Sequence, residues 1–210
     1  MQSNLFSSEH TALNLLGAEV TYTQAFIENQ QNYFEILKNE IQWQRDVIQI
    51  AGKTVPIPRL NAWYGDKGAS YCYSGISLTP LAWTPTLLQL KTRIEHETTE
   101  PFNSVLLNYY RDGNDSVAWH SDDEAQLGTK PLIASLSFGA TRRFSLRGPV
   151  ALCKQGSSDL HSTNTLHIDL EGGSLLVMGG QTQQYWRHQI AKTKKTVGPR
   201  INLTFRRIVS

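Results

Sequence analysis

The sequence predicts an α+β protein whose core is a β-sandwich or jelly roll. Two amphipathic helical segments come first, about seven short β-rich segments follow residue 102, and Gly- or Asn-containing turns separate those segments. No repeat and no long Pro/Gly/Ser linker divides the 210 residues. We therefore expect a single domain over residues 1–210.

Two helices are predicted in the first half of the chain. Apolar residues near helical spacing predict the first helix over residues 23–41. Thr84 and Pro85 are typical of an N-cap and a first helical position, so the second helix is predicted to begin there. Its apolar face would be formed by Leu87, Leu88 and Ile94. Residues 1–20 show little pattern, and we expect them to be loosely ordered.

The remaining segments are predicted to be strands. Residues 44–50 and 54–58 would pair around a tight turn at residues 51–53. From residue 102 onward, short segments rich in β-branched and aromatic residues would form the jelly-roll core over residues 102–210. The strands expected in it cover residues 105–110, 116–120, 132–138, 143–147, 165–170, 174–178 and 201–208.

Composition excludes several classes of protein. Twenty Lys and Arg against 18 Asp and Glu give a net charge of +2, but residues 172–210 contain no acid, which favours contact with a polyanion or an anionic cosubstrate. Two cysteines exclude a disulfide scaffold and a four-Cys zinc site. No apolar stretch approaches the ~20 residues of a membrane span, and the first residues lack signal-peptide features. We expect a cytoplasmic monomer with no membrane contact.

His120 and Asp122 are the first candidate site residues. On an extended chain, side chains two residues apart point to the same face, so this imidazole and this carboxylate can bind one ion. With His188 as third ligand they would form the 2-His-1-carboxylate triad of non-haem iron oxygenases. A pair of this kind, taken alone, is more often a turn device or a solvated pair. The competing third ligands are His10, His96, His161 and His167.

Residues 200–206 alternate between two faces. Ile201, Leu203 and Phe205 form the apolar face, and Arg200, Asn202, Thr204 and Arg206 form the polar one. A strand that buries two arginines needs an anion, because an unpaired buried charge is costly. A small dicarboxylate would satisfy both guanidinium groups. The alternative, commoner for a terminal strand, places the polar face in water.

Asn108 and Tyr110 share one face of a predicted strand just upstream of His120. Their amide and phenol groups would hold the oxygens of a cosubstrate. The alternative is that this Tyr-rich strand packs against a loop.

Together these segments resemble the AlkB family of Fe(II)- and 2-oxoglutarate-dependent dioxygenases, which repair alkylated nucleic acid bases. The resemblance covers residues 48–208 and is greatest to the eukaryotic DNA-repair homologues. It implies a double-stranded β-helix, a form of jelly roll, with the N-terminal helices packed outside. The matching segments are residues 64–66, 71–75, 108–110, 120–124, 135–139, 173–176, 186–188 and 200–206.

The resemblance also implies a reaction and the residues that perform it. Fe(II), 2-oxoglutarate and dioxygen would demethylate 1-methyladenine and 3-methylcytosine in DNA, releasing formaldehyde, succinate and CO2. The iron ligands would be His120, Asp122 and His188. Arg200 would pair with the distal carboxylate of 2-oxoglutarate, and Arg206 would assist at its keto-acid end. The pocket would be completed by Asn108, Tyr110 and Thr204.

On the substrate side, the resemblance implies a nucleotide-recognition region over residues 44–75. Tyr73 would stack on the flipped base, and Glu124 would face its exocyclic amine. Tyr71 and Asp123 would also line this side, where rings and carboxylates favour a cationic methylated base. Cross-strand packing of the tyrosines and a solvated loop acid are the alternatives.

Ala51 stands where family members that act on duplex DNA carry a bulky wedge. Its small side chain predicts a preference for single strands, unless Ile50 takes over the wedge role. Candidate phosphate contacts are Lys53, Lys194 and Lys195, although a solvated surface lysine is the commoner role of each.

Three other functions remain open from the sequence. An RNA-directed demethylase would use the same mechanism, because recognition of the 2′-hydroxyl depends on a few contacts. A zinc hydrolase would use the same three ligands but would leave Arg200 and Arg206 unexplained. A non-catalytic nucleic-acid-binding module would explain the basic C-terminal region and leave the triad without a role.

Overall fold

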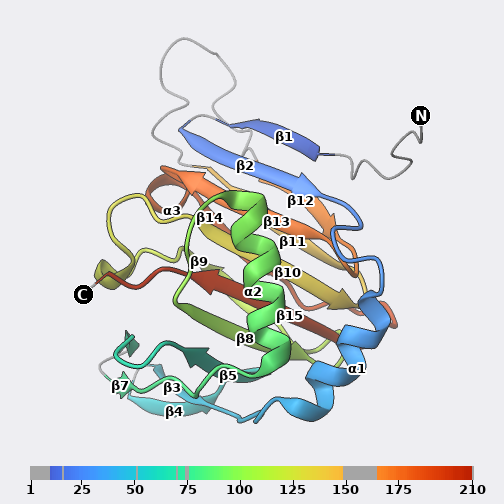
Figure 1. Ribbon diagram of the computed structural model, residues 1–210. Coiled ribbons are helices and arrows are strands. Elements are labelled where there is room, and N and C mark those ends of the chain that lie inside the picture. The colour runs from blue at the N-terminus through green and yellow to red at the C-terminus, as the bar shows by residue number, and fades with distance from the viewer. Residues whose placement is uncertain are drawn as a thin grey trace.

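The computed structural model describes residues 10–15, 17–50, 52–69, 71–73, 76–148 and 165–209. Within these residues, two antiparallel sheets face each other, and the two longer helices cover the outer face of the larger sheet (Figure 1). This arrangement confirms the predicted jelly roll with its helices packed outside. No helix of the described segments is both long and apolar enough to cross a membrane.

The larger sheet has seven strands in the described part of the chain. In sheet order they are β1 (His10–Leu15), β2 (Ala18–Thr23), β13 (Leu175–Gly180), β10 (Ile133–Gly139), β15 (Arg200–Arg206), β8 (Ser104–Tyr110) and β5 (Leu60–Gly65). Strands β1, β2 and β5 thus join this sheet from outside residues 102–210. The prediction that residues 1–20 are loosely ordered is wrong for β1 and the start of β2.

In the view of Figure 1 the smaller sheet lies behind the larger one, and it has four strands among the described residues. In sheet order they are β12 (Thr165–Leu170), β11 (Arg142–Arg147), β14 (Arg187–Ile190) and β9 (Val117–His120). Two separate hairpins pair β3 (Val47–Ile50) with β4 (Lys53–Pro56), and β6 (Tyr71–Tyr73) with β7 (Ile76–Leu78). Both hairpins fall within residues 44–75 or directly after them.

Helix α1 (Gln30–Glu40) is shorter than the sequence predicts. Residues 18–23 belong to β2, where Ala18, Val20 and Tyr22 alternate as buried positions. The connection then passes through Ala25 at φ +48, which a right-handed helix does not contain. The helix therefore begins only after this turn.

Helix α2 (Pro85–Thr98) begins where the sequence predicts. The Thr84 side chain accepts a hydrogen bond from the Leu87 amide at 3.2 Å, and Pro85 occupies the first turn, where its missing N–H costs nothing. Leu87 and Ile94 are buried, but Leu88 is 45% exposed, so its predicted place on the apolar face is wrong. The remaining short helices are α3 (Thr182–Tyr185) and the 3-10 turn η1 (Ala125–Leu127).

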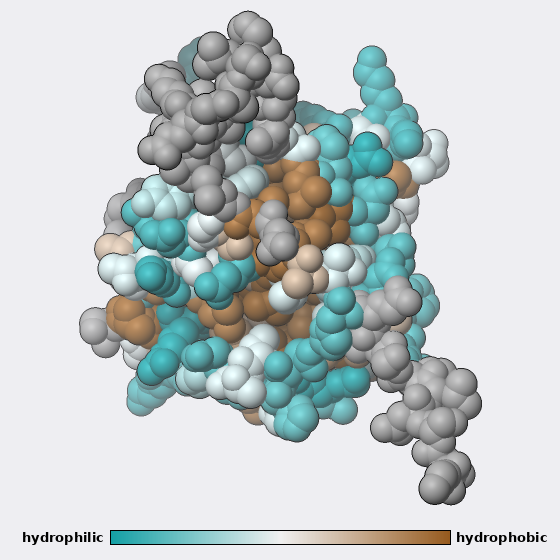
Figure 2. Space-filling model, turned by 90° about the horizontal axis from the view of Figure 1, so that it is seen from above, coloured by the Kyte–Doolittle hydropathy of each residue, from teal (hydrophilic) through white to brown (hydrophobic). Residues whose placement is uncertain are grey.

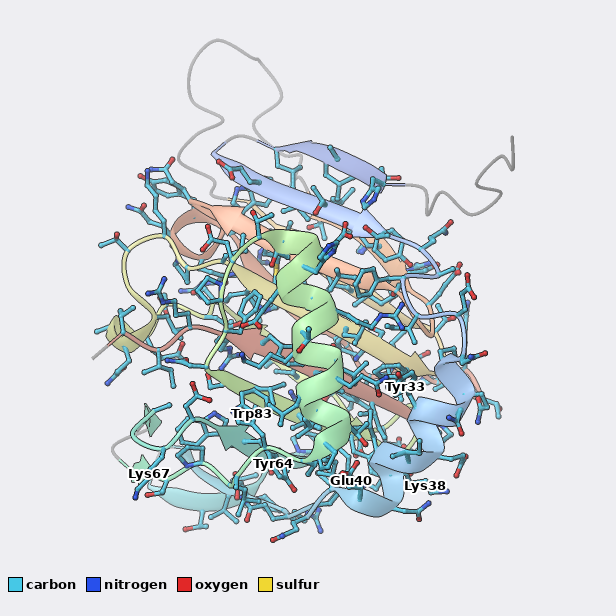
Figure 3. All side chains as sticks on the ribbon, viewed as in Figure 1. Tyr33, Lys38, Glu40, Tyr64, Lys67 and Trp83 are labelled. Atoms are coloured by element: carbon cyan, nitrogen blue, oxygen red, sulfur yellow. The ribbon has the colours of Figure 1, made fainter. Side chains whose placement is uncertain are left out.

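An outer hydrophobic cluster joins α1 and α2 to the larger sheet. Figure 3 labels Tyr33 on α1 and Trp83 just before α2, both beside this sheet. The ring of Tyr33 lies 5.8 Å from that of Phe138, and Trp83 stacks on Phe205 at 6.3 Å. This layer anchors the outer face of β10 and β15.

A second hydrophobic cluster fills one part of the space between the sheets. It combines residues of the larger sheet, such as Ile133 and Met178, with residues of the smaller one, such as Leu146 and Ile190. Leu13 and Leu15 of β1 pack partly buried against it. Seen from above the view of Figure 1, apolar surface gathers near the centre of the molecule, with hydrophilic residues around it (Figure 2).

Apolar and polar residues alternate along β15, as the sequence predicts, so that one face of the strand contacts the outer cluster and the other points between the sheets. Ile201, Leu203 and Phe205 are completely buried in the outer cluster. The other face of the strand points between the sheets and is also buried, so its arginines do not lie in water. Its residues are Arg200, Asn202, Thr204 and Arg206.

Candidate active site

His120, Asp122 and His188 form a compact group on the smaller sheet. His120 ends β9 and pairs directly with His188 of β14, with ring centroids 4.2 Å apart. Asp122 follows β9, and its Oδ1 lies 3.8 Å from His120 Nε2. The potential ligand atoms all lie within 4.8 Å of one another, and no other group of this kind occurs in the described segments. Two imidazoles and one carboxylate fit a non-haem iron site with open positions.

The competing histidines lie outside this group. His10, His96 and His167 are described and do not join it, whereas His161 lies outside the described residues. Pairing of β14 with β9 is what selects His188, because two residues directly opposite on neighbouring strands have adjacent side chains.

The surroundings of the group favour the metal-binding forms of Asp122 and His188. Burial alone would raise the pKa of Asp122, but the charges of Arg206 and the two histidines hold it below its usual value. Burial, and then the charge of His120, lowers the pKa of His188 to about 3. His120 Nδ1 lies 2.9 Å from the carbonyl oxygen of Ala118, which orients the ring with Nε2 toward Asp122. A carboxylate and a neutral imidazole are the forms in which these two residues bind a metal.

Arg200, at the start of β15 in the larger sheet, is 1% exposed. Its Nη2 donates to Ser137 Oγ at 2.9 Å and to Asn202 Oδ1 at 2.8 Å, and the Tyr110 ring lies 5.3 Å from the guanidinium. Nε and Nη1 are buried without a hydrogen-bond partner in the described part of the chain. Burial lowers the pKa of Arg200 to about 10, so the group stays charged at pH 7. Two unsatisfied donors on a buried cation fit the distal carboxylate of 2-oxoglutarate.

A line of polar side chains connects Arg200 with the rest of β15. Ser135 Oγ donates to Asn202 Oδ1 at 2.9 Å, and Asn202 Nδ2 donates to Thr204 Oγ1 at 2.8 Å. Arg206 then reaches the metal group, with Nη2 2.8 Å from Asp122 Oδ1. The polar face of β15 thus runs from Arg200 to the candidate metal ligand Asp122.

Asn108 and Tyr110 of β8 lie beside this face, since β8 pairs with β15. Arg59 Nε donates to Asn108 Oδ1 at 2.6 Å, which turns the Asn108 amide group so that Nδ2 is left for other acceptors. Arg142 lies over Tyr110, with its guanidinium carbon 5.6 Å from the ring centroid, and donates to the carbonyl oxygens of Asp115 and Ala191. Sequence reasoning missed both arginines, because no local pattern marks either.

Gln183 is a third residue that sequence reasoning missed. It is 4% exposed, and its Oε1 accepts a hydrogen bond from the Asp122 amide at 2.9 Å. The two residues are 61 positions apart in the sequence. Only the folded chain brings them together.

The residues predicted on the substrate side differ in exposure, and some of them fall outside the described residues. Asp123 is exposed and Glu124 is half-buried, with Oε2 buried and unpartnered among the described residues. Lys53 on β4 is exposed, as are Lys194 and Lys195 before β15. Tyr71 and Tyr73 lie on β6, but their side chains and the whole of Ala51 fall outside the described residues.

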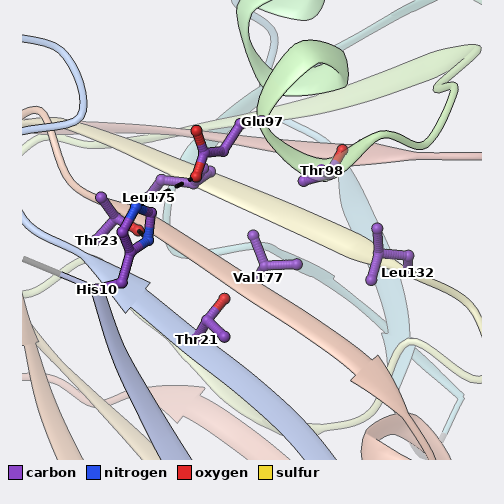
Figure 4. A pocket seen from close by; sticks show the side chains of 8 residues that line it. All are labelled: His10, Thr21, Thr23, Glu97, Thr98, Leu132, Leu175 and Val177. Carbon is purple, nitrogen blue, oxygen red and sulfur yellow. Dashed lines mark hydrogen bonds and ion pairs between the residues drawn. The ribbon is translucent and has the colours of Figure 1, made fainter. Parts of the chain in front are cut away.

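A separate hollow of about 130 Å³ opens between β1, β2 and the end of α2 (Figure 4). His10 lies on its wall, 3.6 Å from Glu97, and Leu175 and Val177 lie on its floor. It shares no residue with the metal group or with the polar face of β15. The candidate active site is therefore the space between the sheets and not this hollow.

Sequence comparison finds relatives along nearly the whole chain. The profile of the 2OG-Fe(II) oxygenase superfamily matches residues 19–206. The alpha-ketoglutarate-dependent dioxygenase alkB homolog 3 of Mus musculus is 45% identical over 175 residues, which are 83% of this chain and 60% of the mouse protein. The DNA oxidative demethylase ALKBH2 of Homo sapiens is 36% identical over 197 residues, which are 92% of this chain and 74% of the human protein. The chain thus spans about 60% of the length of the mouse relative.

Structure comparison agrees on the fold. A solved structure of OsALKBH1 superposes with a TM-score of 0.61 at 18% sequence identity, covering 95% of this chain and all of that one. At this identity the match supports the fold alone.

Proposed function

Since the chain belongs to the AlkB family of the 2OG-Fe(II) oxygenase superfamily, we propose that it catalyses Fe(II)- and 2-oxoglutarate-dependent oxidative demethylation of N-alkylated bases in DNA. The observation that carries the proposal is the meeting of two half-sites. A metal-ligand triad lies at one end of the polar face of β15, where Arg206 contacts Asp122. The buried guanidinium of Arg200 lies at the other end, with Nε and Nη1 lacking a hydrogen-bond partner among the described residues. The relatives named as dioxygenase and DNA oxidative demethylase support both the reaction and the substrate class.

In this proposal, His120, Asp122 and His188 hold iron, and Arg200 binds the distal carboxylate of 2-oxoglutarate. When bound, iron, 2-oxoglutarate and dioxygen supply the oxidation that turns an N-methyl group into formaldehyde, with succinate and CO2 as the other products. The chain's own task is orientation. Arg206 fixes the Asp122 carboxylate, and Asn108 presents its Nδ2 donor beside the polar face of β15.

The substrate side follows from charge. Glu124 Oε2, which is buried and has no partner in the part of the chain that the structure describes, would accept a hydrogen bond from the exocyclic amine of 1-methyladenine or 3-methylcytosine. Tyr73 of β6 would stack on the base, and Asp123 would add negative charge near its positively charged ring. A base inside a duplex must be extruded first, at a cost of a few kcal/mol. With Ala51 at the hairpin turn, single strands are the proposed preferred substrate.

The test uses protein loaded anaerobically with ferrous iron and mixed with oxygen, 2-oxoglutarate and a single-stranded oligonucleotide carrying one 1-methyladenine. Mass spectrometry follows loss of the methyl group alongside succinate. Demethylation that requires 2-oxoglutarate is the expected result. Competition with duplex DNA and with the matching RNA then orders the substrates.

Other outcomes of this test would redirect the proposal. Succinate without demethylation would keep the dioxygenase and reject this substrate. Neither product, from protein shown to hold iron, would reject the reaction and favour a non-catalytic nucleic-acid-binding role.

A further inference from the structure

The metal-ligand carboxylate Asp122 lies on a loop, between the end of β9 and η1. Loops hold side chains less firmly than strands do, and His120 and His188 are both fixed by strand pairing. The side chain of Asp122 is held on one side by Arg206. Its backbone is held from another direction, by the side-chain oxygen of Gln183.

Gln183 is itself held firmly. It lies on α3, the single helical turn that connects β13 to β14. The Thr182 hydroxyl donates to the carbonyl oxygen of Gly179, the Gln181 amide donates to Gly17 at 2.9 Å, and the Trp186 amide donates to Thr182 at 2.9 Å. Trp186 packs in the cluster between the sheets. The Gln183 side chain is therefore presented from a rigid turn that leads directly into the strand carrying His188.

We infer that Gln183 is a positioning residue of the metal centre: by accepting the Asp122 amide hydrogen, it sets where the carboxylate ligand stands relative to His188. Gln183 and His188 are five residues apart, on α3 and on the strand that follows it. The hydrogen bond therefore connects Asp122 to the segment that carries His188. Partners that orient metal ligands in this way change metal affinity by about 10- to 100-fold when they are removed.

The neighbour Gln184 gives a matched control. It has the same side chain and lies on the same helical turn, but it is exposed. A Gln-to-Met replacement keeps the length of the side chain and removes its oxygen acceptor. At position 183 it leaves the buried Asp122 amide without its acceptor, whereas at position 184 it changes only the surface.

The experiment titrates metal-free protein with Co(II), whose visible absorption reports its coordination. We expect Gln183→Met to bind Co(II) roughly 10- to 100-fold more weakly than wild type, and Gln184→Met to bind it as wild type does. Gln183→Glu keeps an oxygen acceptor and is expected to bind Co(II) far more tightly than Gln183→Met. Hydrogen exchange of metal-free Gln183→Met should rise in residues 121–124 and stay unchanged in β11 and β13.

Two results would overturn the inference. One is equal Co(II) affinity of Gln183→Met and Gln184→Met. The other is a Gln183→Met protein whose exchange rises throughout both sheets, because Gln183 would then support the fold in general. The inference rests on the proposed metal centre and not on the proposed substrate. Protein that binds Co(II) in the expected pattern but demethylates no base would reject the proposed function alone.

Discussion

Arg206 and Asp122 form a buried ion pair between the two sheets, with Nη2 2.8 Å from Oδ1. Arg206 comes from β15, the strand that also carries Arg200, and Asp122 lies on the loop that follows β9 of the smaller sheet. Each charge of the pair partly offsets the cost of burying the other, and the contact fixes Asp122 next to the polar face of β15. Any change at one partner should therefore affect both the metal site and stability.

Replacing Asp122 with Ala should abolish iron binding and all turnover, because one of three ligands is lost. Removing one partner of a buried pair also costs about 3–5 kcal/mol of unfolding free energy. The variant should still unfold cooperatively, at a lower temperature. Iron content by elemental analysis and thermal unfolding check this, with Asp123→Ala at the exposed neighbour as the control. Normal iron content in Asp122→Ala would remove the residue from the triad.

Replacing Arg200 with Met should sharply raise the concentration of 2-oxoglutarate needed for turnover. Loss of a buried charged contact costs about 2–5 kcal/mol, so KM for 2-oxoglutarate should rise roughly 30-fold or more. Without 2-oxoglutarate, the variant should be about as stable as wild type: it loses the two hydrogen bonds of Nη2, but it also removes a buried charge whose Nε and Nη1 have no partner among the described residues. Steady-state kinetics and thermal shifts with and without 2-oxoglutarate test both points.

The exposed Arg207→Met variant serves as the control for Arg200. An unchanged KM in Arg200→Met would assign the anion site to another residue. A variant that loses stability before 2-oxoglutarate is added would show that Arg200 serves the fold.

Metal-free protein should lose stability as the pH falls from 7 toward 4, in part through His188. Burial lowers the pKa of His188 to about 3, whereas the unfolded chain protonates this side chain near its ordinary value of 6.5. Between these values the unfolded state binds one more proton, so stability falls by up to about 1.4 kcal/mol per pH unit. The groups that set this shift besides burial are His120, Asp122 and Arg206.

Thermal unfolding of metal-free protein at pH 7 and pH 5 measures this loss. His188→Leu should show a smaller difference between the two pH values than wild type. An equal difference in both proteins would mean that other groups account for the acid sensitivity.

Replacing Ala51 with Phe should raise activity on duplex DNA relative to single strands. An aromatic ring at the hairpin turn could fill the space that a flipped base leaves, whereas alanine offers little stacking surface. The ratio of initial rates on matched duplex and single-stranded oligonucleotides measures this. Val55→Phe, on the β4 side of the same hairpin, adds a ring away from the turn and should leave the ratio unchanged. If Ala51→Phe also leaves it unchanged, the wedge has no role in strand preference.

The parts of the site that could be predicted from the sequence are those with local patterns. The alternation of residues 200–206 predicts the buried polar face of β15, and Thr84 with Pro85 predicts the start of α2. His120 and Asp122 are two residues apart, a spacing that places both side chains on one face of an extended chain, and the structure brings them together.

The remaining parts depend on contacts between distant segments. Strand β14 has only four residues, two of them exposed or half-exposed polar ones, and it exists because it pairs with β11 and β9. Arg59 and Gln183 act on residues 49 and 61 positions away. No periodicity in the sequence encodes such contacts, which is why these side chains were not predicted.

Strand β15 has a consequence for how the protein is made. It follows every other described strand in the sequence, yet it lies between β10 and β8 in the interior of the larger sheet. During synthesis, β10 and β8 are made before β15, so one edge of each strand stays unpaired and prone to aggregation until β15 has been synthesised. Closure of the sheet and assembly of the anion site are thus one late event. Slow or stalled translation before residue 200 should yield chains that depend on chaperones to stay soluble.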